Sequence, residues 1–164
     1  MRKNLEYKSI LYSTGDKLVK IVLEILDELL DNDSSTFIDE RREDFLIKKD
    51  DITFIGEIKG ISQSVANKNV AQLDNHVQEY MDKLELEKKE ENVKGLLIIN
   101  HQRKMPLEKR QKIHENQLRI ATRNGALIIE TQTLLDLYDK FKKQEITKEE
   151  CKRLFTEEVG ILNI

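Results

Sequence analysis

The feature that most constrains the fold is VKGLLIIN, residues Val93 to Asn100, an apolar run of strand length. A run of this kind indicates a strand covered on both faces, because a strand with one solvated face alternates apolar and polar residues. A second such run, ALIIET, follows at residues 126–131. The sequence therefore predicts a sheet that lies between two layers of helices.

Amphipathic helices are expected around these strands. The segment 16–30 places five apolar residues at helical spacing: Leu18, Val22, Ile25, Leu26 and Leu29. The segment 68–86 repeats the pattern with Val70, Leu73, Val77, Tyr80 or Met81, and Leu84. A third helix is expected after Pro106, in LEKRQKIHENQLRIATRNG, with its stop at Asn124-Gly125. Two short helices, TLLDLYDKFKKQ and TKEECKRLF, are expected near the C-terminal end.

A hairpin is expected before the second helix. DFLIKK (Asp44 to Lys49) and ITFIGEIKG (Ile52 to Gly60) have the length and composition of strands, with a turn at Asp50-Asp51. A hairpin followed by strand–helix–strand alternation predicts an α/β fold, a mixed sheet of four to five strands with helices on both faces. We expect a single domain over residues 1–164, with a core at about 11–140 and terminal helices at 141–164.

Composition narrows the class of protein. No apolar stretch approaches the roughly 20 residues of a membrane span, and the N-terminal segment lacks the apolar region of a secretory signal. The single cysteine, Cys151, excludes an internal disulfide and fits a reducing compartment. We therefore expect a cytoplasmic protein without a membrane partner. The net charge of −3 argues against indiscriminate binding to nucleic acid, although a local basic cluster lies at residues 101–112.

The end of the second hairpin strand carries an acid and a base two positions apart. Side chains alternate along a strand, so Glu57 and Lys59 project to one face while Ile58 points to the other. If the two strands pair antiparallel, Asp44 is a cross-strand neighbour of Glu57. Glycines at Gly56 and Gly60 would let another backbone or a ligand come close.

Two carboxylates and a lysine at one sheet edge suit a particular chemistry. Carboxylate oxygens hold a hard divalent cation such as Mg²⁺, which polarises a phosphodiester and activates water. A neighbouring lysine orients that water or stabilises the charge that develops on the phosphate oxygens. The alternative to a catalytic site is a solvent-exposed Glu-x-Lys pair on a surface strand, since such pairs are common in a chain rich in both residues.

The run EDFLIKKDDITFIGEIKG resembles the core motif of the PD-(D/E)xK, or restriction-endonuclease-like, nuclease superfamily. NKNVAQLDNHVQEY resembles the helix that follows the lysine strand in many of these nucleases, and GLLIINHQRKMPLEKR resembles a strand and basic loop of some prokaryotic members. The resemblance covers about residues 11–140. It implies a nuclease that depends on Mg²⁺ or Mn²⁺, acts on DNA rather than RNA, and serves restriction, antiviral defence or repair.

The resemblance also implies roles for individual residues. Asp44 and Glu57 would be metal ligands together with the carbonyl of Ile58, Lys59 would be the catalytic lysine, and Gln72 would lie near the metal or the phosphate. Two departures stand out. Glu43 replaces the proline that often precedes the first acid, and Val19 occupies the position of a helix glutamate, for which Glu24 or Glu28 would substitute.

The basic cluster offers candidates for phosphate contact. His101 ends a buried strand and is followed by Arg103, Lys104 and Arg110, which could hold phosphate, although a strand-end histidine is also a common structural hydrogen-bonding group. His76 and His114 fall on helices and are expected to be ordinary, partly exposed residues.

Two other functions remain open at this point. The chain could be a nuclease-fold module that no longer cleaves and serves as an interaction or assembly domain, or a structural α/β domain. Partners expected with the nuclease hypothesis are nucleic acid, a second copy in a homodimer, and a larger defence complex or a fused domain.

Overall fold

The computed structural model describes residues 2–34 and 45–164. Its helices are Arg2–Lys8 (α1), Gly15–Leu30 (α2), Asn67–Leu86 (α3), Glu115–Arg123 (α4), Thr131–Lys142 (α5) and Lys148–Glu157 (α6), with 3₁₀ turns at Ser9–Leu11 and Leu107–Lys109. Its strands are Phe45–Lys49 (β1), Ile52–Gly60 (β2), Asn92–Asn100 (β3), Leu127–Glu130 (β4) and Gly160–Ile161 (β5).

The strands form one mixed sheet in the order β1-β2-β3-β4-β5. β1 and β2 pair antiparallel, and β2, β3, β4 and β5 are parallel to one another. The predicted hairpin is confirmed, and so is a mixed sheet of four to five strands, since the described residues form five. The sequence did not predict β5, which is too short to show a pattern of its own, or α1.

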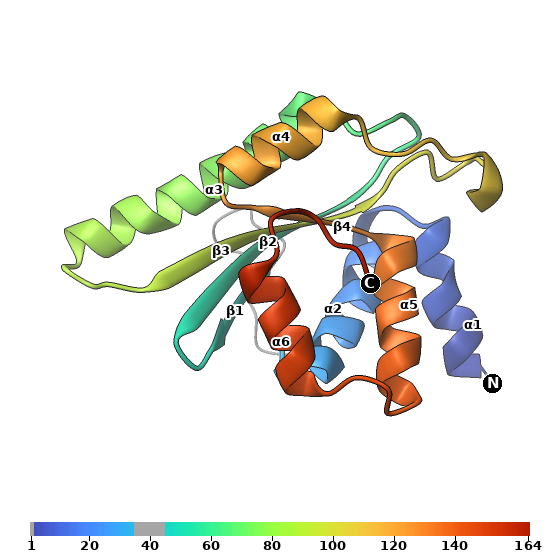
Figure 1. Cartoon of the computed structure of the whole chain (residues 1–164), viewed down its shortest axis with the longest axis horizontal. Coiled ribbons are helices and arrows are strands. Elements are labelled where there is room, and N and C mark those ends of the chain that lie inside the picture. The colour runs from blue at the N-terminus through green and yellow to red at the C-terminus, as the bar shows by residue number, and fades with distance from the viewer. Residues whose placement is uncertain (1, 35–44) are drawn as a thin grey trace.

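Helices cover both faces of the sheet, with α3 and α4 on one side and α1, α2, α5 and α6 on the other (Figure 1). The central strand β3 shows how the two layers divide its side chains. Leu96 and Ile98 pack in the cluster under α2 and α5, while Leu97 and Ile99 pack in the cluster under α3 and α4. This division confirms that the continuous apolar run is buried on both faces.

The two long helices lie where the sequence predicted them. The five apolar residues expected to face the core from α2 are all buried: Leu18, Val22, Ile25, Leu26 and Leu29. In α3 the choice between Tyr80 and Met81 is decided, because Tyr80 is buried and Met81 is exposed. Hydrophobic periodicity was sufficient here because each helix packs one stripe on the sheet.

The predicted third helix is wrong over its first half. After Pro106 the chain makes one 3₁₀ turn and then a loop, and α4 begins only at Glu115. Side chains take the hydrogen bonds that a helix would make, since Gln102 Oε1 accepts from the Gln111 amide at 2.6 Å. The ring of His114 caps α4 by accepting from the Asn116 amide at 3.2 Å. These local bonds compete with helix formation.

Two glycines of β2 permit close approaches. A Cβ on Gly56 would lie 1.9 Å from the ring of Phe45, its partner across the β1–β2 ladder. A Cβ on Gly60 would lie 2.5 Å from the carbonyl oxygen of Ser13, and the hydroxyl of Thr14 donates to the Gly60 carbonyl at 2.8 Å. The close approach expected at both glycines is therefore made by the protein itself.

The substitution Gly56→Ala should lower the free energy of unfolding by about 1–3 kcal/mol, because the aromatic ring of Phe45 would have to move out of its place. Urea denaturation followed by circular dichroism measures the loss. Gly95→Ala is the matched control in the neighbouring strand, since its methyl group would meet only the ends of Val77 and Leu73 at 3.1 and 3.3 Å. Equal losses in the two variants would contradict the role of the Phe45 contact.

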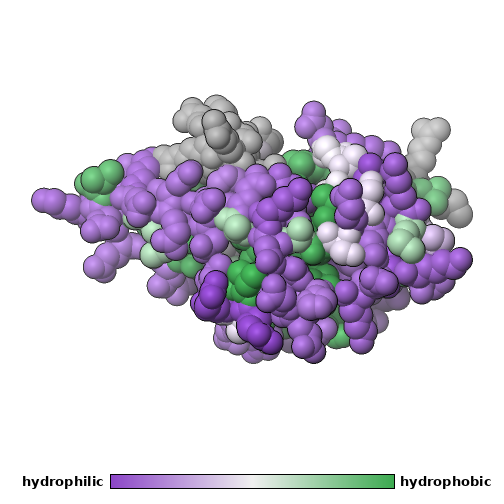
Figure 2. Space-filling view, turned by 90° about the horizontal axis from the view of Figure 1, so that it is seen from above, coloured by the Kyte–Doolittle hydropathy of each residue, from purple (hydrophilic) through white to green (hydrophobic). Residues whose placement is uncertain are grey.

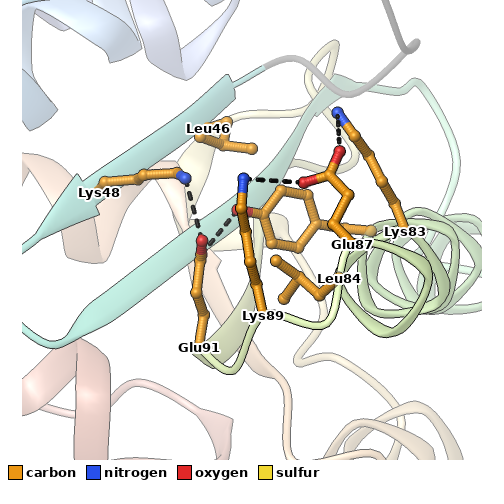
Figure 3. A pocket seen from close by; sticks show the side chains of 8 residues that line it. Leu46, Lys48, Lys83, Leu84, Glu87, Lys89 and Glu91 are labelled. Carbon is orange, nitrogen blue, oxygen red and sulfur yellow. Dashed lines mark hydrogen bonds and ion pairs between the residues drawn. The ribbon is translucent and has the colours of Figure 1, made fainter.

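At the opposite end of the sheet from Gly60, Glu91 joins three elements (Figure 3). Its carboxylate accepts hydrogen bonds from Thr53 of β2 at 2.6 Å and Tyr80 of α3 at 2.7 Å, and forms an ion pair with Lys48 of β1 at 3.1 Å. These donors, the Thr53 hydroxyl first, lower the pKa of Glu91 to about 2. The adjoining pocket of about 320 Å³ is lined by lysines and glutamates that pair with one another.

The lowered pKa of Glu91 predicts a loss of stability in acid. The group stabilises the fold above its ordinary pKa of 4.5, and this contribution disappears as the pH falls from about 4.5 towards 2. Glu91→Gln should lower the free energy of unfolding at pH 7 by about 1–3 kcal/mol and by much less at pH 3. Urea denaturation at both pH values measures this, and an equal loss at both would contradict the assignment.

The surface seen from the side of α3 and α4 is mostly hydrophilic, with apolar residues in small separate patches (Figure 2). Among the described residues, no helix combines the length and apolar character that a membrane span requires.

Candidate active site

Glu57 and Lys59 lie on the same face of β2, as the alternation of the strand predicts. Their side chains form an ion pair, with Lys59 Nζ 3.2 Å from Glu57 Oε2. Ile58 between them packs in the core on the opposite face, with α2. The Glu57 side chain is only 1% exposed, whereas Lys59 is 33% exposed, so the pair runs from the interior towards solvent.

His76 of α3 is the second partner of the Glu57 carboxylate. Its Nδ1 lies 2.6 Å from Glu57 Oε1, and its side chain is 8% exposed. The expectation of an ordinary, partly exposed helix histidine is therefore wrong. A signal was present in the sequence, because His76 lies between Leu73 and Tyr80 at the helical spacing of the buried stripe. Burial of a carboxylate requires such partners.

Asp44 lies outside the described residues, so its role as a metal ligand stays a prediction. The described part of the β1–β2 ladder begins at the next residue. Phe45 pairs with Gly56, which directly precedes Glu57. The antiparallel pairing on which the prediction for Asp44 depends is therefore confirmed up to its sequence neighbour.

Helix α2 does not bring an acid to Glu57. It packs on the opposite face of the sheet, where its apolar residues join Ile58, Phe54 and Phe45. Glu28 accepts a hydrogen bond from Tyr138 at 3.0 Å and pairs with Lys142, both on α5. Glu24 is half-buried on the same helix. The role of Glu24 at a metal site stays a prediction, and the packing of α2 on the face of the sheet opposite the Glu57 side chain does not favour it.

Gln72 lies on α3 one turn before His76. Residues four positions apart share a helix face, so the two side chains project to the same side of α3. Gln72 is half-buried, and its side chain makes no hydrogen bond to any residue that the structure describes. Its predicted contact with metal or phosphate stays a prediction, and its place beside His76 agrees with that prediction.

The basic cluster, residues 101–112, forms a loop after β3, and the start of this basic loop binds the segment that follows Lys59. The Ile61 amide donates to the Asn100 carbonyl at 3.0 Å, the Gln102 amide to the Gln63 carbonyl at 3.0 Å, and the Arg103 amide to the Ile61 carbonyl at 3.1 Å. Because β2 and β3 are parallel, these bonds extend the ladder past the strand ends. They carry the basic loop to the same rim of the sheet as Lys59.

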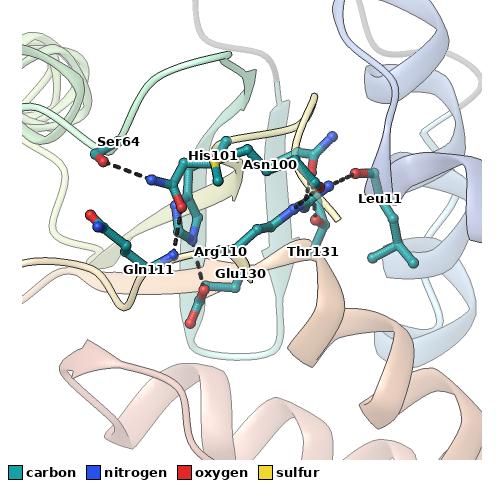
Figure 4. A network of polar contacts seen from close by, with 10 residues as sticks. Leu11, Ser64, Asn100, His101, Arg110, Gln111, Glu130 and Thr131 are labelled. Atoms are coloured by element: carbon teal, nitrogen blue, oxygen red, sulfur yellow. Dashed lines mark hydrogen bonds and ion pairs between the residues drawn. The ribbon is translucent and has the colours of Figure 1, made fainter. Parts of the chain in front are cut away.

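Arg110 is engaged with protein acceptors (Figure 4). It donates to the side-chain oxygen of Asn100 at 2.9 Å, to the carbonyl of Met105 at 3.1 Å, and to the carbonyl of Leu11. Asn100 in turn donates to the Ser13 carbonyl at 2.9 Å. Desolvation by the surrounding protein lowers the pKa of Arg110. Arg110 thus ties the basic loop to the segment before α2, and its contact with phosphate stays a prediction.

The other members of the basic cluster differ in their surroundings. His101 is buried, and its Nε2 lies 2.8 Å from Glu130 Oε2 of β4, which agrees with the structural alternative for this histidine. Arg103 is half-buried, and its buried Nε has no hydrogen-bond acceptor within residues 2–34 and 45–164. Lys104 is exposed. Arg103 and Lys104 are therefore better placed than Arg110 to contact an added phosphate.

Comparison with known proteins finds no matching protein-family model and no curated protein of significant similarity. The solved structure of restriction endonuclease FokI does match, with a TM-score of 0.65 over 95% of this chain at 15% identity. The fold is restriction-endonuclease-like. The match spans 30% of the FokI chain, and at this identity it concerns the fold alone.

Two groups that can bind a cation meet at Glu57. A carboxylate and an imidazole, both buried and 2.6 Å apart, are groups that divalent cations accept as ligands. Within residues 2–34 and 45–164, no three acidic, histidine or cysteine side chains come together in a metal-binding group. The described residues therefore supply part of a metal site, and the predicted role of Asp44 would complete it.

Removal of the Arg110 side chain should destabilise the fold rather than only weaken binding. Arg110→Ala leaves the acceptors on Leu11, Asn100 and Met105 without their donor, so the free energy of unfolding should fall by about 2 kcal/mol. Thermal and urea denaturation measure the change. Lys104→Ala, at an exposed position of the same loop, should change it by less than about 0.5 kcal/mol. Equal stability of the two variants would mean that Arg110 does not hold the loop.

Proposed function

We propose that this protein is a metal-dependent nuclease that hydrolyses phosphodiester bonds, with DNA as its substrate. The observation that carries the proposal is the Glu57–Lys59 pair, in which a buried carboxylate and a half-exposed ammonium share one face of β2. In a surface Glu-x-Lys pair without a function the carboxylate stays in solvent, because its burial is unfavourable unless charged or hydrogen-bonding partners stabilise it. The restriction-endonuclease-like fold supports the same reading.

Each residue has a task in this proposal. Glu57, together with Asp44 and the carbonyl of Ile58, would hold Mg²⁺ or Mn²⁺, and the bound cation would supply Lewis-acid polarisation of the scissile phosphate. The Lys59 ammonium would stabilise charge that develops on the phosphate oxygens. Its place at the solvent end of the pair lets it meet a substrate that approaches from outside.

The substrate backbone would lie along the rim formed by Lys59 and the basic loop. Arg103 and Lys104 would neutralise phosphates there, and Gln72 would approach the same strand from α3. Contacts of this kind position a strand without reading its sequence. A homodimer with two such sites would cut both strands of a duplex. A partner complex or a fused domain would supply sequence specificity.

The decisive test is cleavage of supercoiled plasmid, linear duplex and single-stranded DNA and RNA, with Mg²⁺, with Mn²⁺ and with EDTA. The wild-type protein should cleave DNA only with a divalent cation. Asp44→Ala, Glu57→Gln and Lys59→Ala should each lower the rate by about a hundredfold or more, because each removes charge at the reacting phosphate. Glu115→Gln, at an exposed position of α4, is the control that should keep full activity.

Two outcomes would overturn parts of this proposal. A folded variant with full activity would remove that residue from the site. A folded wild-type protein that cleaves none of these substrates would favour the alternative, a nuclease-fold module that serves as an interaction or assembly domain.

A further inference from the structure

We infer that His76 is a nitrogen ligand of the metal site and that the site prefers transition-metal ions, Mn²⁺ among them, over Mg²⁺. The inference rests on the proposed function, because it takes Glu57 as a metal ligand. His76 Nδ1 lies 2.6 Å from Glu57 Oε1, a contact that the sequence did not predict.

The two oxygens of Glu57 have different neighbours. Oε2 lies 3.2 Å from the Lys59 ammonium, and Oε1 lies beside the His76 ring. A cation that takes Oε1 and Nδ1 as ligands therefore leaves the Lys59 contact in place. In this arrangement Oε1 binds the cation, while Oε2 holds the Lys59 ammonium that stabilises phosphate charge.

The two ligand atoms lie at hydrogen-bonding distance, and only a small shift would let both bind one ion. Neighbouring ligands in an octahedron with bonds of about 2.1 Å lie about 3 Å apart, so Oε1 and Nδ1 would need to separate by only about 0.4 Å. His76 is held on a 20-residue helix that packs on β2 and β3, and Glu57 lies within a strand that is paired on both sides. Ligands on such elements are positioned before an ion arrives.

The donor set decides which ion is preferred. Carboxylate oxygens alone suit Mg²⁺, whereas imidazole nitrogen suits transition metals and binds Mg²⁺ poorly. A site that combines Glu57 with His76 would therefore bind Mn²⁺ or Co²⁺ more tightly than Mg²⁺. A purely structural His76 would only hydrogen-bond the carboxylate and would leave the order of metal affinities unchanged.

Metal binding measured without nucleic acid tests this inference. Isothermal titration with Mn²⁺, Co²⁺ and Mg²⁺ should show wild-type protein binding Mn²⁺ at least tenfold more tightly than Mg²⁺. His76→Gln should lose tenfold or more in affinity for Mn²⁺ and Co²⁺ and less than twofold for Mg²⁺. His114→Asn is the matched control, since it removes an exposed histidine and keeps a good helix cap, and its affinities should equal those of the wild type.

Pulsed electron paramagnetic resonance can detect a nitrogen ligand of bound Mn²⁺ while His76 is intact. The measurement uses His114→Asn protein, which lacks the exposed histidine. Nitrogen modulation of the imidazole type is expected, and bound Mn²⁺ without it would overturn the inference while the proposed function stands. An unchanged affinity for Mn²⁺ in folded His76→Gln protein would also overturn the inference and leave the proposed function standing. Wild-type protein that binds none of the three ions would overturn the proposed function together with the inference.

Discussion

The burial of the Glu57 carboxylate is the constraint on which the arrangement of the site depends. A carboxylate in the interior is tolerated only when charged or hydrogen-bonding partners surround it. Here Lys59 supplies one partner from the same strand and His76 supplies another from α3. The position of α3 on the sheet is therefore tied to the chemistry of β2 as well as to its apolar contacts.

Close packing around β2 explains why its glycines are there. The ring of Phe45 covers Gly56, and the segment before α2 reaches Gly60. The first contact determines how β1 lies against the residue that precedes Glu57. The second, with the bonds of Asn100 and Arg110 to the same segment, joins the start of α2 to the ends of β2 and β3. The rim that carries Lys59 and the basic loop is thus joined to the start of α2 by direct contacts.

Most of the fold followed from periodicity, and the two exceptions have different causes. β2 and α2 could be predicted almost to the residue because each shows one clear hydrophobic period. The segment after Pro106 also looked helical, yet Gln102 and Arg110 bind the neighbouring backbone and hold it as a loop. A competing hydrogen bond to a side chain a few residues away leaves no trace in the spacing of apolar residues. β5 was missed because two residues show no period at all.

The sequence by itself determined the mixed sheet between two helical layers and the shared face of Glu57 and Lys59, because alternation along a strand is a local property of the backbone. Only the tertiary structure decided that His76 contacts Glu57 and that α2 lies across the sheet from this carboxylate. It also decided that the Arg110 side chain donates to Asn100, while the buried Nε of Arg103 has no acceptor among the described residues. Those facts depend on how separate elements pack together. Packing is set by the shapes and partners of residues that are far apart in the chain, which a local pattern does not record.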